Sequence, residues 1–416
     1  MTPMKISFSS QMTSSLSEAI LLRMISVEQA VCLIRANLLD FGTEETSVKK
    51  LDSNITAQSI LADRDYPPFH RVMMDGIAVM FNIYQEGKRE FRVDGICPAG
   101  EPQKILSDLS SCLEVMTGVP LPQGTDLVIP YEHVKIENGV AYVIKEEIRS
   151  HMENVHLKGS DAKNGDVILA SGEQFHGPHW GIAASVGAIN ITVKKKPKIN
   201  IISTGDELVE VHAKPLEHQI RRSNAYALKA SLMLFGYEEI ELSHLPDDVE
   251  AIENHYLKAK DNFDMMIYSG GVSQGKFDYL PSTWKKLGVK EIFHGIAQRP
   301  GKPLWFGVHD ESKTVVIGLP GNPVSGLVCL HRYFLDHNEI YAELMEKIIF
   351  KKDLTYFVPV KIQYTREGKI KALPLKMKNS GEFSALAGSD GFMELPRDQS
   401  VFNSGKSYLF HPWRPM

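Results

Sequence analysis

The sequence predicts a multidomain protein of class α/β plus β. Its 416 residues are too many for one hydrophobic core of ordinary size. Between residues 197 and 348, apolar runs alternate with helical patterns, which is typical of a parallel, doubly wound α/β sheet. Residues 66–150 and 349–416 consist of short β-branched runs broken by glycine and proline, so two β domains are expected there.

The N-terminal region begins with a segment that the sequence assigns to no packed element. Residues 1–23 are rich in Ser, Thr and Met without a sustained period, and we expect them to be a loosely held leader. A helix is expected directly afterwards, because Ser26 and Gln29 form a capping box. Apolar residues at helical spacing predict its buried face, made of Val27, Val31, Ile34 and Leu38.

Each β region contains a hairpin pattern. In "YEHVKIENGVAYVIKE" the pair Asn138-Gly139 is expected in a two-residue turn, because both positions of such a turn require positive φ. "FVPVKIQYTREGKIKALPL" is expected to be a second hairpin, in the C-terminal β region.

Composition excludes several classes of partner and site. A net charge of -5 without a basic stripe interleaved with aromatic residues argues against nucleic acid. The four cysteines show no Cys-x-x-Cys spacing, so neither a zinc ribbon nor a disulfide framework is expected. The most apolar stretch is interrupted by Arg23, Glu28 and Gln29, well short of a membrane span. We therefore expect a cytoplasmic protein with no membrane partner.

Three glycine-bearing turns follow apolar runs in the α/β region, in "KINIISTGDEL", "FDMMIYSGGVS" and "KTVVIGLPGNP". Because ligands collect at the carboxyl ends of parallel strands, these turns should share one functional edge. Residues 269–275 can curl into a nest of backbone N–H groups that binds an anion. In "GLPGNPVSG", Asn322 is expected to cap a helix, leaving the N–H groups of Val324 and Ser325 free for an oxyanion.

Three acids accompany these turns. Glu207 and Asp278 each follow a glycine turn of the α/β region, and Asp75 lies in "MMDG" of the first β region. Carboxylates without His or Cys companions suit Mg²⁺ or general acid/base work better than zinc. For any one of them a solvated surface acid is the competing interpretation, just as one glycine turn alone is ordinary turn chemistry.

The ordered motifs resemble one family closely. "PPFHRVMMDGIAV", "PAGEP", "VMTGVPLPQGTDLVIPYE", "NVHLKGSD", "ISTGDEL", "SGGVSQGKFDY", "RPGKPLWFG" and "GLPGNPVSG" occur in the order and approximate spacing of the molybdopterin molybdenumtransferases, a family that includes bacterial MoeA and the E domain of gephyrin. The resemblance runs from about Ile25 to the C-terminus. A shared sheet topology alone would not produce eight ordered motifs.

The resemblance implies a fold, a reaction and partners. The family inserts molybdate into adenylated molybdopterin and releases AMP with the help of Mg²⁺. Its fold is an elongated homodimer of four subdomains, in which the α/β subdomain is MogA-like and faces the β domain of the partner chain. The implied division is a helical, dimerisation subdomain from residues 24–65 and 151–196, an inserted β subdomain 66–150, an α/β subdomain 197–348 and a barrel-like C-terminal β subdomain 349–416. The resemblance also suggests a MogA-like adenylyltransferase as a partner.

The resemblance also implies roles for individual residues. Asp75, Glu207 and Asp278 match acids of the hydrolytic step, and Glu207 and Asp278 also match the metal site. Lys302, Ser325 and Ser380 match the surroundings of molybdate. The remaining substrate-binding matches comprise the nest and other positions near the same cleft: Thr117, Gly118, Asp161, Ser269, Gly270, Gly271, Ser273, Gly275, Lys276, Arg299 and Asn322.

Several positions depart from the family pattern. His70 and Arg71 replace a carboxylate-containing pair, while Arg222 and Lys276 each replace an acid, and Lys361 stands in for an arginine. Each exchange of a carboxylate for a cation changes the local charge by two units. Two functions are therefore weighed: a working insertase with a more cationic site, which is preferred, and a catalytically impaired paralogue that binds molybdopterin or oxyanions or acts as a scaffold. A generic phosphate-binding sugar or nucleotide enzyme would not require the other motifs.

Overall fold

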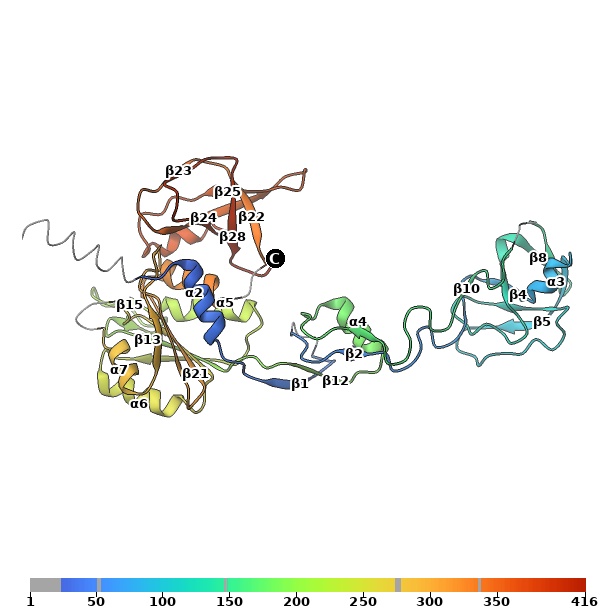
Figure 1. The fold of residues 1–416 in the computed structure, drawn as a ribbon, viewed down its shortest axis with the longest axis horizontal. Helices are drawn as coiled ribbons and strands as arrows, with labels where there is room; N and C mark the ends of the chain where they lie inside the picture. Colours follow the sequence, from blue (N-terminus) through green and yellow to red (C-terminus); the bar gives the residue numbers. More distant parts are fainter. Residues whose placement is uncertain (1–23, 51–53, 146, 148, 274–277, 336–337) are drawn as a thin grey trace, which may run out of the picture. The chain divides into compact units, whose positions relative to one another are not determined.

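A computed structural model describes residues 24–50, 54–145, 147, 149–273, 278–335 and 338–416 (Figure 1). The chain divides into two compact units. The large unit comprises the chain up to Gly42 together with Lys195–Met416, and the small unit comprises Thr43–Lys194. The expected leader, 1–23, lies outside the described residues.

A six-stranded sheet forms the centre of the large unit, in the order β16-β13-β17-β21-β20-β18. The first four strands are parallel, and β20 and β18 continue the sheet antiparallel. The strands are β13 (Ile199–Thr204), β16 (Ile240–Leu245), β17 (Met265–Ser269), β18 (Lys290–His294), β20 (Trp305–His309) and β21 (Thr314–Leu319). The residues of β13, β17 and β21 are largely apolar and buried on both faces, as is usual in a parallel sheet.

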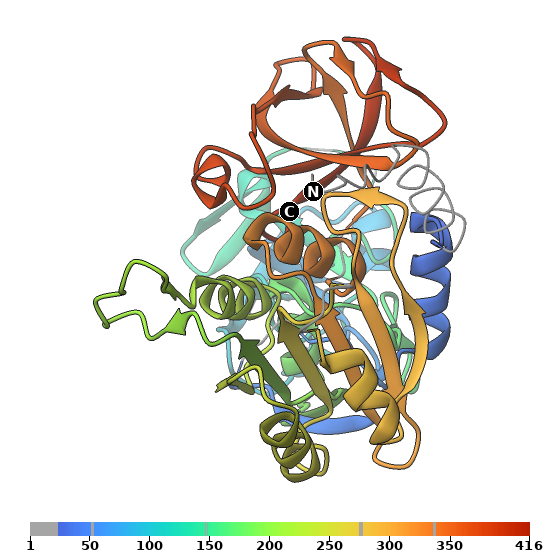
Figure 2. The ribbon, with the colours of Figure 1, turned by 90° about the vertical axis from the view of Figure 1, so that its left-hand side faces the viewer.

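Helices cover both faces of this sheet, which confirms the doubly wound prediction (Figures 1 and 2). One face packs in a core cluster with α2, α5 and α8, and the other packs in a second cluster with α6 and α7. The helices are α2 (Val27–Asn37), α5 (Ser223–Leu234), α6 (Val249–Ala259), α7 (Leu280–Lys286) and α8 (Pro323–Tyr333). A two-stranded ribbon, β14 (Leu208–Val209) with β15 (Ile220–Arg221), precedes α5.

The predicted start of α2 is confirmed, and its predicted face is partly wrong. Ser26 Oγ accepts a hydrogen bond from the Gln29 backbone N–H at 3.2 Å, and Gln29 Oε1 accepts one from the Ser26 N–H at 2.8 Å. The buried residues are Val27, Ala30 and Ile34. The helix ends before Leu38, which is exposed, because the backbone becomes extended there.

The C-terminal strands of the large unit close into a five-stranded barrel, as the resemblance implies. The ring runs β24-β25-β22-β28-β26 and returns to β24, with β19 (Gln298–Arg299) paired to β24. Figure 2 shows this barrel in red and orange at the top. Its elements are β22 (Ile340–Leu344), β23 (Ile348–Ile349), β24 (Thr355–Tyr364), β25 (Ile370–Pro374), η2 (Phe383–Leu386), β26 (Gly391–Leu395), β27 (Val401–Phe402) and β28 (Ser407–Pro412). Strands β24 and β25 form the expected hairpin.

The small unit contains a second six-stranded sheet, in the order β7-β4-β6-β5-β9-β8. The Asn138-Gly139 turn is confirmed: both residues have positive φ, +50° and +76°, between β8 and β9. The elements around this sheet are β4 (Gly76–Val79), α3 (Phe81–Gln85), β5 (Glu90–Cys97), β6 (Cys112–Val115), β7 (Leu127–Pro130), η1 (Tyr131–His133), β8 (Val134–Glu137) and β9 (Val140–Val143).

Three strand pairs and one helix complete the small unit. Each pair is antiparallel and joins segments far apart in the sequence. They are β1 (Thr43–Ser47) with β12 (Asn190–Lys194), β2 (Ile60–Leu61) with β11 (Val167–Leu169), and β3 (Arg71–Val72) with β10 (Val155–His156); the helix is α4 (Gly177–Ser185).

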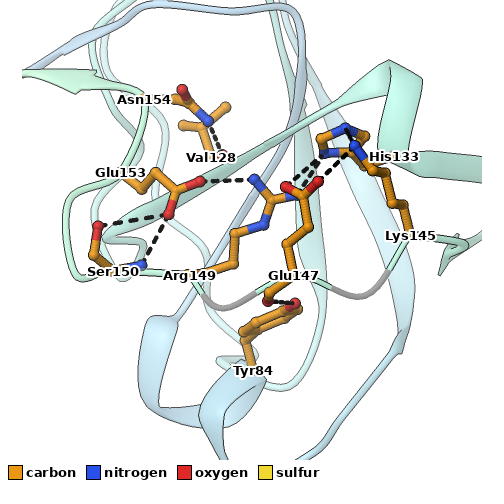
Figure 3. A network of polar contacts seen from close by, with 9 residues as sticks. All are labelled: Tyr84, Val128, His133, Lys145, Glu147, Arg149, Ser150, Glu153 and Asn154. Atoms are coloured by element: carbon orange, nitrogen blue, oxygen red, sulfur yellow. Dashed lines mark hydrogen bonds and ion pairs between the residues drawn. The ribbon is translucent and has the colours of Figure 1, made fainter.

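A buried arginine, Arg149, holds together the residues that follow the last strand of the small unit's six-stranded sheet (Figure 3). The Arg149 side chain is 3% exposed and forms ion pairs with Glu153 at 2.7 Å and Glu147 at 3.3 Å. Its guanidinium also donates to Nδ1 of His133. The hydroxyl of Tyr84 donates to the backbone oxygen of Glu147 at 2.9 Å. A charge that is this deeply buried requires such partners, so the network fixes the path of the chain that leaves the sheet.

The four cysteines are free thiols, as expected. Across the described part of the chain, no helix has both the length and the apolar character needed to cross a membrane.

Candidate active site

A cavity of about 880 Å³ opens at the carboxyl edge of the large sheet. Its lining includes the turns that follow β13, β17 and β21. These strands are consecutive and parallel in the sheet, so the prediction that the three glycine turns share one edge is confirmed. The cavity also receives residues from the segment before β24 and from the turn before η2, both in the C-terminal part of the chain.

The turn after β17 has the backbone of an anion nest in its described part. Gly270 and Gly271 have φ values of +105° and +66°. A Cβ would lie 3.0 Å from the Thr204 hydroxyl if it were added to Gly270, and 3.2 Å from it if it were added to Gly271. The backbone can therefore approach Thr204 this closely only because both residues are glycine. The N–H of Gly270 is already bound to the Leu319 carbonyl at 3.1 Å, so the groups available to a ligand begin at Gly271. Ser269 and Ser273 line the same cavity, whereas Gly275 and Lys276 lie outside the described residues.

The N-terminus of α8 differs from the prediction in one respect. Asn322 occupies the N-cap position and Pro323 the first helical position, as expected. However, the Asn322 side chain donates to Ser380 Oγ at 2.8 Å rather than capping the helix. The N–H of Val324 donates to the Ser380 carbonyl at 3.2 Å, so it is not free for an oxyanion. Asn322, Ser325 and Ser380 nevertheless all line the cavity.

Acids gather on the part of the cavity formed by the turns after β13 and β16. Glu207 and Asp278 line it, as does Asp247, which the sequence reasoning missed. Desolvation raises the pKa of Asp247 although the residue is largely exposed, and the negative charges of Asp206, Glu207 and Asp278 raise it further. Asp247 follows the fourth parallel strand, so the edge rule could have found it without a glycine turn as a marker.

Cations from several segments face the same cavity. Arg299 and Lys302, both predicted, line it, and so do Arg221, Arg222 and Lys352. These cations outnumber the carboxylates of Glu207, Asp247 and Asp278 in the described lining, so positive charge is in excess there. A cationic cavity with low-dielectric walls concentrates anions, although the whole chain has a net charge of -5.

A buried amide holds the segment that carries Arg299 and Lys302. The Gln298 side chain is buried and donates to the Pro300 carbonyl at 3.0 Å and to Cys329 Sγ at 3.4 Å. It also accepts a hydrogen bond from the Tyr333 hydroxyl. Burial raises the pKa of the Cys329 thiol, which therefore stays protonated and acts as a packing and hydrogen-bonding group. The turn that presents the two cations is thus fixed from behind.

Four predicted residues lie in the small unit. Asp75 Oδ1 accepts hydrogen bonds from the Thr117 N–H at 2.6 Å and the Thr117 hydroxyl at 2.7 Å, and these bonds lower the pKa of the Asp75 carboxyl. Gly118 adjoins this pair, with its N–H bound to the Val72 carbonyl at 2.8 Å. Gly76 begins β4 and permits the close approach of β7, because a Cβ there would lie 2.0 Å from the Ile129 carbonyl oxygen.

The fourth of these residues, Asp161, is held by a chain of side chains. His156 Nε2 lies 2.7 Å from Asp161 Oδ1, and Arg71 lies 2.9 Å from His156 Nδ1. Because arginine can only donate, Nδ1 accepts and the ring proton is on Nε2, where it is donated to Asp161. The hydrogen bond from His156 lowers the pKa of Asp161. Arg71, one of the departures from the family pattern, therefore sets the tautomer of a residue that contacts a predicted site residue.

Two other departures, His70 and Lys361, have ordinary surroundings. His70 Nδ1 accepts a hydrogen bond from the Lys158 N–H at 3.1 Å. Lys361 is exposed on β24 and is not among the described residues that line the cavity.

Mg²⁺ fits the donor chemistry of the cavity. Glu207, Asp247 and Asp278 supply hard carboxylate oxygens. Among the residues that the structure describes, no three His, Cys, Asp or Glu side chains are gathered as a complete ligand cluster. A metal here would thus complete its shell with water and substrate oxygens, as Mg²⁺ commonly does.

Family models match almost the whole chain in three consecutive segments. The MoeA N-terminal region (domain I and II) matches residues 25–187, the probable molybdopterin binding domain matches 200–337, and the MoeA C-terminal region (domain IV) matches 341–413. The chain belongs to the MoeA family.

Relatives with known names agree with this membership. The chain is 54% identical over 390 residues to the molybdopterin molybdenumtransferase of a Synechocystis strain, covering 94% of this chain and 100% of that protein. It is 30% identical to the Haemophilus influenzae protein of the same name, covering 89% and 94%. The crystal structure of a MoeA molybdopterin biosynthesis protein from Pyrococcus horikoshii superimposes with a TM-score of 0.79 at 28% identity, covering 94% and 100%. The multidomain MoeA fold predicted from the motifs is therefore confirmed.

Proposed function

We propose that the protein is a molybdopterin molybdenumtransferase of molybdenum cofactor biosynthesis, which inserts molybdate into adenylated molybdopterin and releases AMP. The observation that carries this proposal is the cavity itself. In a chain of the MoeA family, one sheet edge brings together a glycine nest, several cations and three carboxylates. Such an arrangement suits a phosphorylated substrate, a second oxyanion and a hydrolytic step.

The chain's own residues divide these tasks. The nest that begins at Gly271 and the hydroxyl of Ser273 bind the phosphate side of the pterin nucleotide. Arg299 and Lys302 hold molybdate with Ser325 and Ser380, on the segments that Gln298 and the Asn322–Ser380 hydrogen bond keep in place. Charge-assisted hydrogen bonds of this kind are roughly twice as strong as neutral ones.

The carboxylates act on the water that releases AMP. Asp278 or Glu207 can accept the proton of that water. Glu207, Asp247 and Asp278 would also hold Mg²⁺, which when bound supplies neutralisation of negative charge that develops on phosphate oxygens.

A homodimer is part of the proposal. The resemblance places the α/β subdomain of one chain against the β domain of its partner, which would let Asp75, Thr117, Gly118 and Asp161 complete the partner's cavity. The subdomain division given above, a location in the cytoplasm and receipt of the adenylated substrate from a MogA-like adenylyltransferase belong to the same proposal.

Release of AMP by the purified full-length chain tests the activity. The protein is incubated with adenylated molybdopterin, molybdate and Mg²⁺, and AMP is followed by chromatography. Steady AMP release that depends on molybdate supports the insertase. Binding of the nucleotide without release would instead support the catalytically impaired paralogue, which the 54% identity to a named transferase does not favour.

Mixing two inactive variants tests the dimer. Asp75→Asn and Asp278→Asn are purified separately, mixed, and briefly exposed to mild denaturant so that subunits exchange. If each cavity is built from two chains, a mixed dimer regains one intact cavity, and activity should recover to about a quarter of wild type when half of the dimers are mixed. No recovery, or a mass near 46.6 kDa in light scattering, would contradict a shared cavity.

A further inference from the structure

A buried arginine at the cavity has unused hydrogen-bonding capacity. The Arg222 side chain is 7% exposed, and it lines the cavity immediately before α5. Within the described part of the chain it forms an ion pair with Glu210, at 3.4 Å, and Glu210 is 45% exposed. Among the described residues its buried Nε has no hydrogen-bond partner. A guanidinium that is largely removed from water normally has its donors satisfied, so this one is prepared for a ligand.

Two serine hydroxyls lie on the same face of the sheet as α5. Ser203 follows Ile199 and Ile201 at alternate positions of β13, and those isoleucines pack in one cluster with the α5 residue Leu228. Ser269 is the residue of β17 paired in register with Ser203. Because alternate residues of a strand share a face, both hydroxyls point to the side on which α5 begins.

These hydroxyls also have capacity for a ligand. Ser203 is 2% exposed, and its buried Oγ has no hydrogen-bond partner among the described residues. Ser269 Oγ accepts a hydrogen bond from the Asn224 side chain at 3.1 Å, which leaves its own hydrogen to donate. Asn224 is itself fixed by a second bond, to the Gly321 carbonyl at 2.8 Å.

We propose that Arg222, Ser203 and Ser269 form a second oxyanion subsite in this cavity, which binds one phosphoryl group of the nucleotide substrate while the nest after Gly270 binds the other. The inference rests on the proposed function for the identity of its ligand. An adenylated phosphate ester is a phosphoanhydride, so it has two adjacent phosphoryl groups. Thr204 and the glycines of the nest lie toward the other face of the sheet, where Leu280 of α7 packs. The two phosphoryl groups therefore meet two separate sets of hydrogen-bond donors.

Charge explains why the ligand is an anion. Glu210 is too exposed to neutralise Arg222 strongly, because ion pairs at the surface are screened by water and salt. A tetrahedral oxyanion can accept from Nε and from both serine hydroxyls at once. Free molybdate has the same chemistry as a phosphoryl group here, so the experiment must distinguish the two.

Calorimetric titration of the full-length chain with ADP, AMP and molybdate tests the subsite. Arg222→Gln removes the charge and the donor fork, and Arg366→Gln is its matched control, since Arg366 is exposed in the turn between β24 and β25. Loss of a hydrogen bond to a charged group predicts a rise of about tenfold to a hundredfold in the Kd for ADP in Arg222→Gln. The control should bind like wild type. Ser203→Ala should raise the same Kd by a few fold.

The outcomes separate the alternatives. A selective loss for ADP identifies the ligand as a phosphoryl group, whereas a selective loss for molybdate identifies it as molybdate; either result supports the subsite. Unchanged binding of all three ligands to Arg222→Gln overturns it. If Arg222→Gln does not fold, Ser203→Ala and Arg222→Lys decide in the same way, because lysine keeps the charge but loses the fork.

Failure of the proposed function has a different signature. Wild-type protein that releases no AMP from adenylated molybdopterin, yet binds ADP or molybdate in an Arg222-dependent way, would sink the transferase and leave the subsite. Normal AMP release together with ligand binding that does not depend on Arg222 would support the transferase and overturn the subsite.

Discussion

Replacing Glu394 by glutamine should loosen the C-terminal barrel and the helix packed on it. Glu394 of β26 accepts hydrogen bonds from Arg332 of α8 at 2.6 Å and from His411 of β28 at 2.9 Å. The Arg332 and Glu394 side chains are 16% and 12% exposed, and His411 is 6% exposed. Removing one partner of a buried ion pair costs roughly 3–5 kcal/mol. Since glutamine keeps one acceptor oxygen, we expect the free energy of unfolding to fall by an amount at the low end of this range, about 3 kcal/mol.

Hydrogen exchange with mass spectrometry measures this change where it occurs. A loss of about 3 kcal/mol should speed the exchange of the protected amides of β26 and β28 by about a hundredfold. Glu346→Gln is the matched control, because it removes the same charge from an exposed position near the end of β22. A double variant, Arg332→Met with Glu394→Leu, should lose less than Glu394→Gln, since no charge is left buried without its partner. Equal protection in Glu394→Gln and its control would refute the reasoning.

The group formed by Arg332, Glu394 and His411 also predicts how stability depends on pH. Burial raises the pKa of the Glu394 carboxyl, but the hydrogen bond from His411 and the charge of Arg332 outweigh it and hold the pKa below its ordinary 4.5. A carboxyl with a depressed folded-state pKa contributes stability that is complete above 4.5 and is lost as pH falls through the folded value. Burial lowers the pKa of His411 below 6.5, so protonation of the unfolded chain adds a loss that begins near that pH. Glu394→Gln should abolish the first of these losses, as measured by exchange at a series of pH values.

Three further changes test the cavity and its surroundings. Asp278→Asn should nearly abolish AMP release while nucleotide binding changes by only a few fold, because the acid serves the hydrolytic step; parallel loss of both would contradict that role. Gly271→Ala should weaken ADP binding strongly, since its φ is +66° and its Cβ would lie 2.8 Å from Leu280 Cδ1, and an unchanged titration would exclude the nest. His156→Phe should raise the pKa of Asp161 and move the acid limb of the pH profile of AMP release upward, with recovery in His156→Gln; a profile that stays in place would show that Asp161 is not used.

Features that depend on neighbouring residues in the sequence were predictable. The capping box at Ser26 and the Asn138-Gly139 turn are both set by local backbone preference, and both are confirmed. The shared edge of the three glycine turns was also predictable, because parallel strands in a doubly wound sheet end on the same side. The rest of the architecture, including the barrel, was predicted from the resemblance. No local sequence pattern reveals that β24 and β26 pair and close the barrel.

Features that depend on contacts between distant segments were not predictable. The N–H of Val324 looked free because its acceptor, the carbonyl of Ser380, comes much later in the chain. Arg71 and His156 meet only because β3 pairs with β10 in that register. The sequence identified Arg222 as an exchange of charge, but a single sequence does not reveal that its side chain is buried.

The cavity is where this fold gives up stability. Ser203 Oγ, Thr204 Oγ1 and Arg222 Nε are buried polar atoms without hydrogen-bond partners among the described residues, and all three residues line it. Each unsatisfied group of this kind costs roughly 1–3 kcal/mol. The cost persists because the strands end at this edge and the glycine turns curl away from it, so no described side chain reaches these donors. On the face of the sheet that Ser203 and Arg222 share, an oxyanion can satisfy both, and it gains affinity from donors that the protein has already desolvated and fixed in place.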